Sequence, residues 1–383
     1  MPGVCIHATN ASSAAFGPAW KRPDWRADCS NDQMTPQNLT APAKVSPGDR
    51  VAILSPAFAA PAVSADVHEQ AMKRLTEMNG LIPVEYPTTR QLGASAQARA
   101  ADITAAFADQ TVRAVLATIG GDDQITVIKH LDAAVIADNP KPFLGYSDNT
   151  NLHNFLWGLG ISSFYGGSTQ VHLGAGPRVD DVHLASLRAA LIDGGTIELA
   201  DPGESEDFGI PWTDPLALTQ FGDREATEPW VWSGPKKVVE GRSWGGCLEV
   251  IDQIAMADRM PAVADLEGAI LLIETSEELP AADDVRRWVR ALGERGILEA
   301  AAGVLVARPP VSRLGEPVPA AEERARLRAE QREAIIEQVS AYNLNAVVCA
   351  GVPFGHTRPQ WILPHGGLIR LDGIAQTVTA DYR

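Results

Sequence analysis

Short apolar runs alternate with stretches of helical spacing from about residue 45 to residue 150. The apolar runs predict buried strands at 49–55, 81–86, 112–119 and 142–146. The stretches between them repeat apolar side chains at helical spacing and predict helices at 63–78, 96–108 and 120–137. Strands that alternate with helices over short loops predict a parallel sheet with helices on both faces.

A second block with the same alternation follows a stretch without periodicity. Residues 203–237 hold glycine, proline, acidic residues and three tryptophans, as expected of a long connection or a loop with its own function. Beyond it, the pattern predicts helices at 245–254, 283–292 and 320–339, strands at 269–274, 303–308 and 346–350, and a terminal hairpin. We therefore predict an α/β protein with a flexible tail or over-extended start (1–43), an N-terminal α/β domain (44–205), a connecting loop (206–240) and a smaller C-terminal α/β domain (241–383).

Composition narrows the classes of function. The chain has 383 residues, enough for two domains with cores of their own, and a formal net charge of -16. An acidic chain repels phosphate backbones and anionic lipid, so we expect neither nucleic acid nor a membrane as a partner. The four cysteines lack metal-ligand spacing, and the apolar surroundings of Cys247 and Cys349 predict buried free thiols in a reducing compartment. We expect no metal and no cofactor.

The segment 141–160 carries the strongest chemical signal. A short apolar strand leads to a sharp turn at Ser147, and an apolar-periodic helix follows from about Asn149. A serine on such a strand-to-helix turn presents its hydroxyl above the free amides of the helix, as in a nucleophile elbow. Gly145 precedes the serine by two residues, whereas Asn149 stands where a second glycine is usual. The alternative is that Ser147 and Asp148 only cap the helix.

A nucleophilic serine needs a base and a group that orients the base. Among the eight histidines, His356 follows a predicted strand and a glycine-bounded turn, whereas His365 is predicted to lie in a surface turn. Glu274 closes the all-apolar strand Ile270-Leu-Leu-Ile-Glu274, where an unpaired charge would be costly. We therefore predict His356 as the base and Glu274 as its partner. Alternatively, Glu274 caps a turn or pairs with an arginine, and the nearby Glu277 is predicted to face solvent.

The turn Gly120-Gly121-Asp122-Asp123 follows another strand, and its amides are free for an anion. It is neither a Walker A loop nor a dinucleotide fingerprint, since the required residues are absent. The carboxyl ends of parallel strands meet at one sheet edge, so this turn and Ser147 are expected to converge there. We predict the amides of Gly121 and Asp148 as oxyanion donors. A plain helix start is the alternative.

Five motifs occur in the order seen in the L,D-carboxypeptidase family of serine peptidases, which residues 45–383 resemble. The motifs are Gly145-Tyr-Ser-Asp148, the upstream Gly-Gly turn, Gly245-Gly-Cys-Leu-Glu249, the strand ending at Glu274, and Gly351-x-x-x-Gly-His356. The resemblance implies a Ser147–Glu274–His356 triad. It also implies an N-terminal domain resembling class I glutamine amidotransferases, a cytoplasmic homodimer and no metal.

The family has two relevant branches. One trims the terminal D-alanine from murein tetrapeptides, and the other resembles the microcin C immunity protein, which hydrolyses peptidyl or aminoacyl adenylate analogues. The tryptophan-rich middle stretch and Gly245-Gly-Cys-Leu-Glu249 resemble the second branch, which implies that Trp212 stacks on a nucleobase; alternatively, it packs its own loop. Asp122 is assigned to substrate binding. We predict hydrolysis of an amide-type bond in a small peptide or aminoacyl-nucleotide substrate, with a murein L,D-carboxypeptidase, a non-catalytic small-ligand-binding protein and an α/β-hydrolase esterase as alternatives.

Overall fold

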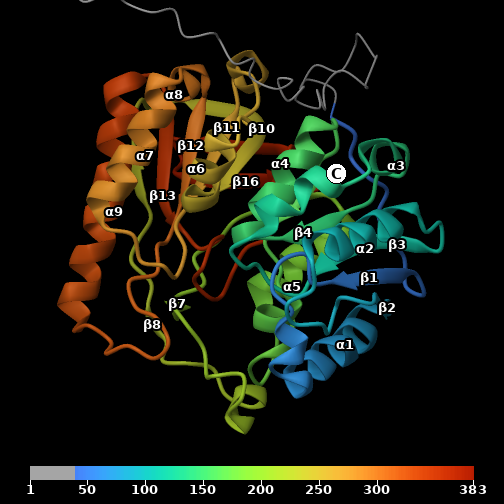
Figure 1. The fold of residues 1–383 in the computed structure, drawn as a ribbon. Coiled ribbons are helices and arrows are strands. Elements are labelled where there is room, and N and C mark those ends of the chain that lie inside the picture. The colour runs from blue at the N-terminus through green and yellow to red at the C-terminus, as the bar shows by residue number, and fades with distance from the viewer. Residues whose placement is uncertain (1–38) are drawn as a thin grey trace, which may run out of the picture. The chain divides into compact units, whose positions relative to one another are not determined.

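The computed structural model describes residues 39–383, in which two sheets carry helices on their faces (Figure 1). The first sheet has the strand order β14-β5-β4-β3-β1-β2, with β1 to β5 parallel and β14 antiparallel to β5. Its strands are β1 (Arg50–Leu54), β2 (Ile82–Glu85), β3 (Val112–Ala117), β4 (Phe143–Gly145), β5 (Ser163–Tyr165) and β14 (Leu363–His365). The helices of this part are α1 (Ala65–Asn79), α2 (Ala96–Ala108), α3 (Ala133–Asp138), α4 (Thr150–Gly158) and α5 (Asp181–Arg188).

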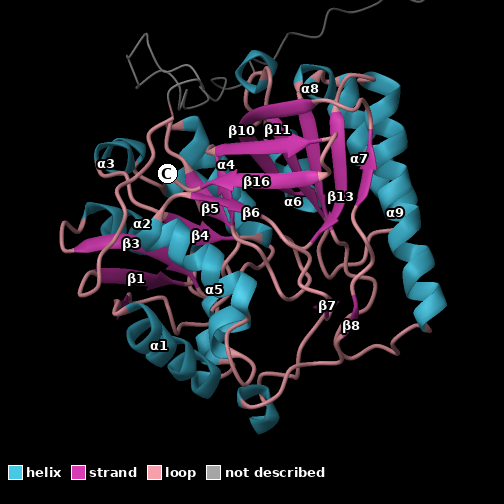
Figure 2. Ribbon diagram, turned by 180° about the vertical axis from the view of Figure 1, so that it is seen from behind, coloured by secondary structure: helices cyan, strands magenta, loops and turns pink. Residues whose placement is uncertain are grey.

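The second sheet has the order β6-β16-β15-β10-β11-β12-β13-β9, with β10 to β13 parallel. Its strands are β6 (Thr196–Glu198), β9 (Val231–Ser233), β10 (Val238–Cys247), β11 (Ile270–Glu274), β12 (Gly303–Ala307), β13 (Val347–Val352), β15 (Leu368–Asp372) and β16 (Thr377–Asp381). Its helices are α6 (Leu248–Met256), α7 (Ala282–Glu294), α8 (Ile297–Ala300) and α9 (Ala321–Tyr342), of which α7 and α9 run side by side (Figures 1 and 2). The short pair β7 (Glu204–Ser205) and β8 (Glu225–Ala226) lies apart from both sheets.

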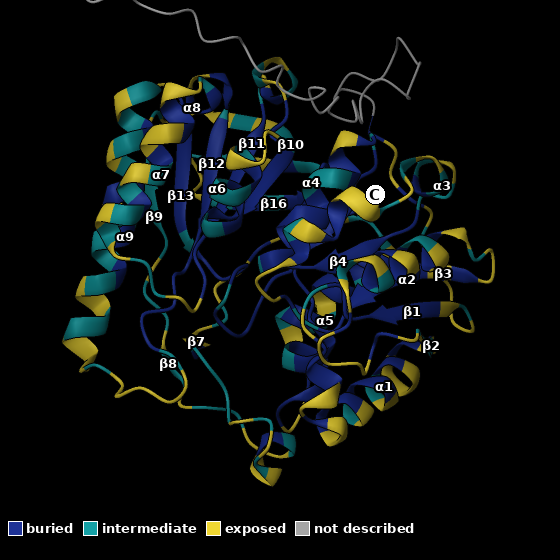
Figure 3. Ribbon diagram, in the orientation of Figure 1, coloured by how far each residue is buried: buried dark blue, intermediate teal, exposed yellow. Residues whose placement is uncertain are grey.

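The two halves of the described chain exchange strands. β14 comes from the C-terminal part but pairs with β5 of the first sheet, and β6 pairs with β16 of the second. One buried cluster contains Tyr165 from the first sheet together with Leu272 and Phe354 from the second half. The central strands β1, β3, β4, β5, β11, β12 and β13 are buried almost throughout, whereas α1 and α9 expose their outer sides (Figure 3). The contact between the halves is therefore part of the core and not a loose joint.

The α/β class and the parallel sheet of the N-terminal half are confirmed, and two predicted helix boundaries are wrong. Residues 120–137 do not form one helix, because two single turns precede α3 and Asp132 caps α3 by accepting a hydrogen bond from the Val135 amide. Gly245 and Gly246 end β10 and do not start a helix. Both have positive φ, and a Cβ on Gly245 would lie 2.0 Å from the Leu272 carbonyl oxygen, so glycine permits this close strand approach.

Among the predictions for single residues, that for the cysteines is confirmed and that for His365 is wrong. Cys247 and Cys349 are buried free thiols, as predicted, whereas Cys5 and Cys29 lie outside the described residues. His365 is fully buried in β14, so its predicted place in a surface turn is wrong. In residues 39–383 no helix is long and apolar enough to cross a membrane. The division of the chain into domains and the likeness to glutamine amidotransferases stay predictions.

Candidate active site

Ser147 lies on a strained turn between β4 and α4. Its φ is 64°, in the left-handed region that non-glycine residues rarely occupy. It is also the one residue of 141–150 that is not buried, so the turn presents its side chain at the surface of an otherwise enclosed segment. Backbone strain at a partly exposed serine between a strand and a helix is characteristic of a nucleophile elbow.

Gly120 packs directly against the serine. A Cβ on Gly120 would lie 2.8 Å from Ser147 Cβ, 3.0 Å from Ser147 Oγ and 3.2 Å from the Asp148 nitrogen. A side chain at this position would therefore clash with the elbow. Gly121, the residue named from the sequence, is exposed, and a Cβ there would meet Ala57 at 2.7 Å. The structure thus brings the Gly-Gly turn to Ser147 mainly through Gly120.

Glu274 and His356 form a buried pair at the carboxyl ends of β11 and β13. His356 Nδ1 lies 2.6 Å from Glu274 Oε2, and the Glu274 side chain is fully shielded from solvent. Burial by itself lowers the pKa of His356, but the charges of Glu274 and Glu277 outweigh this effect and raise the pKa to about 9. A carboxylate that accepts a hydrogen bond from Nδ1 leaves Nε2 as the ring nitrogen able to exchange protons with a substrate or a serine.

Tyr165 connects this pair to the elbow. Its hydroxyl donates to Glu274 Oε1 at 2.6 Å and accepts a hydrogen bond from the Ser147 amide at 3.1 Å. Burial, and then the charge of Glu274, raises the pKa of Tyr165 well above its ordinary value, so the phenol stays protonated and able to donate. The serine backbone, the phenol, the carboxylate and the imidazole are therefore joined in one hydrogen-bonded sequence across the two sheets.

Two further contacts hold the elbow and the imidazole. Thr150 Oγ1 donates to the Ser147 carbonyl oxygen at 2.7 Å and accepts from the Cys247 amide at 3.1 Å, which ties the elbow to the end of β10. The ring of Tyr146 meets the edge of His356 at a centroid distance of 5.0 Å. An edge-to-face contact of this kind limits rotation of the imidazole.

The Asp148 side chain has a structural role. It is fully buried, and its carboxylate accepts hydrogen bonds from the Gln124 amide at 2.9 Å and from Asn151 Nδ2 at 3.0 Å. Burial raises the pKa of Asp148 to about 6, and the charges of Asp123 and Asp122 add to the effect. The Asp148 side chain therefore does not cap α4, whose start has no side-chain cap hydrogen bond, but joins the elbow to the segment that begins at Gln124. The backbone nitrogen of Asp148 faces Gly120 beside Ser147.

The two residues assigned to substrate binding lie in different settings. Asp122 is exposed next to the Gly-Gly turn. Trp212 is half-buried in a small apolar cluster with Val67 of α1 and Ala217 of its own loop. In residues 39–383, no described contact joins Trp212 to Ser147 or to the Glu274–His356 pair. The same part of the chain holds no group of three or more His, Cys, Asp or Glu side chains arranged for a metal ion.

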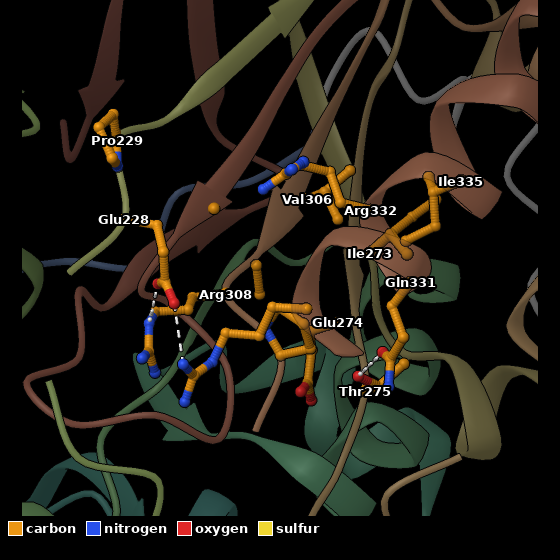
Figure 4. Close-up of a pocket in the computed structure, with 14 residues that line it drawn as sticks. Glu228, Pro229, Ile273, Glu274, Thr275, Val306, Arg308, Gln331, Arg332 and Ile335 are labelled. Atoms are coloured by element: carbon orange, nitrogen blue, oxygen red, sulfur yellow. Dashed lines mark hydrogen bonds and ion pairs between the residues drawn. The ribbon is translucent and has the colours of Figure 1, made fainter. Parts of the chain in front are cut away.

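A small pocket, partly open to solvent, lies at the carboxyl ends of β11, β12 and β13 beside α9 (Figure 4). Glu274 borders it, but neither Ser147 nor His356 does. Arg308 and Arg328 line it, and both pair with Glu228 and with the buried Asp207. These ion pairs fasten the 204–228 segment over the sheet edge, so the pocket belongs to the attachment of that segment.

Sequence reasoning missed Tyr165, Gly120 and the contact of Glu277 with His356. A tyrosine at the end of a short buried strand was a usable signal, because a buried phenol needs a hydrogen-bond partner. Nothing in the sequence indicates which partner it has. Glu277 is 61% exposed, as expected, yet its Oε2 lies 3.1 Å from His356 Nε2.

A strained serine linked through a buried tyrosine to a histidine–carboxylate pair contains the three residue types on which serine hydrolases depend. The family comparisons agree with this class. Residues 51–166 match the LD-carboxypeptidase N-terminal domain and residues 240–371 match the LD-carboxypeptidase C-terminal domain, together more than half of the chain. The chain belongs to the LD-carboxypeptidase family, whose members are serine hydrolases.

Relatives fall in both branches of the family. A Treponema pallidum protein assigned as a carboxypeptidase is 27% identical over 87% of this chain and 92% of its own length. A Bacillus subtilis protein assigned as a murein peptide carboxypeptidase is 27% identical over 69% of this chain and 73% of its own length. The Escherichia coli microcin C7 self-immunity protein MccF is 30% identical over 44% of this chain and 48% of its own. A solved structure of MccF with glutamyl sulfamoyl guanosine has a TM-score of 0.76 and 21% identity, covering 90% of this chain and 98% of that chain.

Proposed function

We propose that this protein is a serine carboxypeptidase-type hydrolase in which Ser147 is the nucleophile, His356 the base and Glu274 the group that orients the base. The observation that carries the proposal is the 2.6 Å contact of His356 Nδ1 with Glu274 Oε2, linked through Tyr165 to the strained Ser147. A helix-capping serine would need neither the strain nor the buried pair.

In this mechanism His356 Nε2 takes the proton of Ser147 Oγ while the oxygen attacks the substrate carbonyl. The imidazolium then gives the proton to the leaving amine, and water repeats the cycle on the acyl-enzyme. Glu274 fixes the tautomer and stabilises the imidazolium. The amides of Asp148 and Gly121 are the proposed oxyanion donors, supported by the contact of Gly120 with Ser147 and the Asp148 nitrogen.

For the substrate, we propose an amide-type bond in an aminoacyl or peptidyl nucleotide-like compound. The likeness to MccF supports this choice, since that protein was solved with a glutamyl sulfamoyl nucleoside and matches nearly its whole length in fold. Trp212 and Asp122 are the proposed substrate contacts. A murein tetrapeptide is the second candidate, supported by the Bacillus subtilis relative. The family resemblance further predicts a cytoplasmic homodimer, which light scattering on the purified protein will test.

The proposal is tested by offering an aminoacyl sulfamoyl adenosine and a murein tetrapeptide to the purified protein and to its Ser147→Ala variant. We expect hydrolysis of the first compound by the native protein and loss of turnover, with an unchanged fold, in the variant. Equal turnover by both proteins would exclude Ser147 as the nucleophile. Tight binding of a compound without hydrolysis by the native protein would instead establish a non-catalytic binding protein.

A further inference from the structure

The Glu277 carboxylate lies against Nε2 of His356, the ring nitrogen that would exchange protons in catalysis. Glu277 lies in the turn after β11, and its Oε2 is 3.1 Å from His356 Nε2 although the side chain is 61% exposed. The Nε2 atom is buried and forms no hydrogen bond within residues 39–383, so Glu277 meets it only as an ion pair. This is the nitrogen that must accept the proton of Ser147. In the structure it faces an acidic side chain instead.

The surroundings of His356 are strongly acidic. Carboxylates approach the ring from the end of β11 (Glu274), from the turn after it (Glu277) and from the start of α6 (Glu249), and all three favour the imidazolium. The rings of Tyr146 and of the buried His172 lie on the side of the first sheet.

The positively charged residue nearest to His356 in sequence, Arg358, already has hydrogen-bond partners. Its guanidinium donates to Asp180 and to the Ala175 carbonyl oxygen. Three carboxylates thus surround a single imidazolium, so a positive group brought by a substrate meets an excess of negative charge at this site.

We propose that Glu277 is a specificity-determining residue that binds an ammonium group next to the scissile carbonyl of the substrate and, by doing so, releases His356 Nε2 for catalysis. An α-ammonium is separated from its carbonyl carbon by one carbon, so a carboxylate 3.1 Å from Nε2 lies within reach of it once the carbonyl is placed for attack. The ammonium replaces the imidazolium as the ionic partner, and charge-assisted hydrogen bonds make this exchange favourable. This inference rests on the proposed function. It implies that Glu277 favours substrates with a free amino group.

Glu278 provides a matched control. It is the neighbouring residue, equally acidic and exposed, and its amide donates to Ser276 Oγ. The charge of Glu277 is one of the leading causes of the raised pKa of His356, together with those of Glu274 and Glu249. Replacement of either residue by glutamine removes one negative charge from the same turn, but only Glu277→Gln removes the partner of Nε2.

The test compares an aminoacyl sulfamoyl adenosine with its N-acetylated counterpart, which has no ammonium. Binding is measured by calorimetry on Ser147→Ala protein, so that the result does not depend on turnover. We expect the free amine to bind about tenfold more tightly, as one charge-assisted contact provides. Adding Glu277→Gln should abolish this preference, and adding Glu278→Gln should retain it.

A second readout follows His356 directly by NMR titration of its ring. Glu277→Gln should lower the titration midpoint, and Glu278→Gln should leave it in place. Retention of the amine preference in the Glu277→Gln protein, equal binding of both compounds, or binding of neither would overturn the inference. Failure of the proposed function would instead show as absence of hydrolysis by protein that carries Ser147, with the binding preference unaffected.

Discussion

Replacement of Tyr165 by phenylalanine removes a single oxygen from the centre of the candidate site. The phenol is fully buried, donates to Glu274 Oε1 at 2.6 Å and accepts from the Ser147 amide at 3.1 Å. Tyr165→Phe keeps the ring and its packing but leaves one lone pair of Glu274 and the amide of Ser147 without these partners. We therefore expect Tyr165 to act as a positioning residue that fixes the elbow relative to the acid.

The size of the effect follows from the contacts. A hydrogen bond to a charged group contributes about 1.5–3 kcal/mol, and if the whole of it aligns Glu274 with His356 the rate falls about 10- to 150-fold. KM should change little, because the phenol is buried behind the reacting groups. Loss of the same bonds should also lower the melting temperature.

Tyr382→Phe separates catalysis from stability. Tyr382 is also fully buried, and its hydroxyl donates to the Ile362 carbonyl oxygen at 2.6 Å, away from Ser147. Both variants should melt at lower temperature, but only Tyr165→Phe should lose kcat. Steady-state kinetics and thermal unfolding of the two variants distinguish a role of Tyr165 in catalysis from a role in stability alone. Equal kcat in Tyr165→Phe and the native protein would refute a positioning role.

Three further predictions address the elbow, the base and the ion-pair network. Gly120→Ala places a Cβ 2.8 Å from Ser147 Cβ and should reduce kcat more than tenfold with the protein still folded, as measured by kinetics and circular dichroism. Because a protonated imidazole cannot accept a proton, kcat/KM should fall as the pH drops below about 9, the raised pKa of His356; a flat profile from pH 6 to 9 would contradict this base. Arg308→Ala breaks a buried network and should lower the free energy of unfolding by about 3–5 kcal/mol in urea titrations, whereas Arg326→Ala, on an exposed pair, should leave it almost unchanged.

The sequence predicted those features that depend on local periodicity and on strand ends. Ser147 follows a short apolar strand, and Glu274 closes another, so their place at a sheet edge was visible in the pattern. Tyr165 and Glu277 were missed because their partners lie in the other half of the chain or across a turn, and no spacing encodes such contacts. The predicted helix at 120–137 was wrong because Gln124 bonds to the elbow segment through Asn149 and the Leu152 amide, which favours separate turns.

The crossing of β14 into the first sheet has a consequence for synthesis on the ribosome. β5 pairs on one side with β4 and on the other with residues 363–365, which are translated long after β5 itself. Until they emerge, the early half of the protein carries an open strand edge, and such edges recruit other chains. The first sheet, which carries the elbow, is therefore closed on this side only after β14 has been translated, and fragments that stop short of β14 are expected to aggregate.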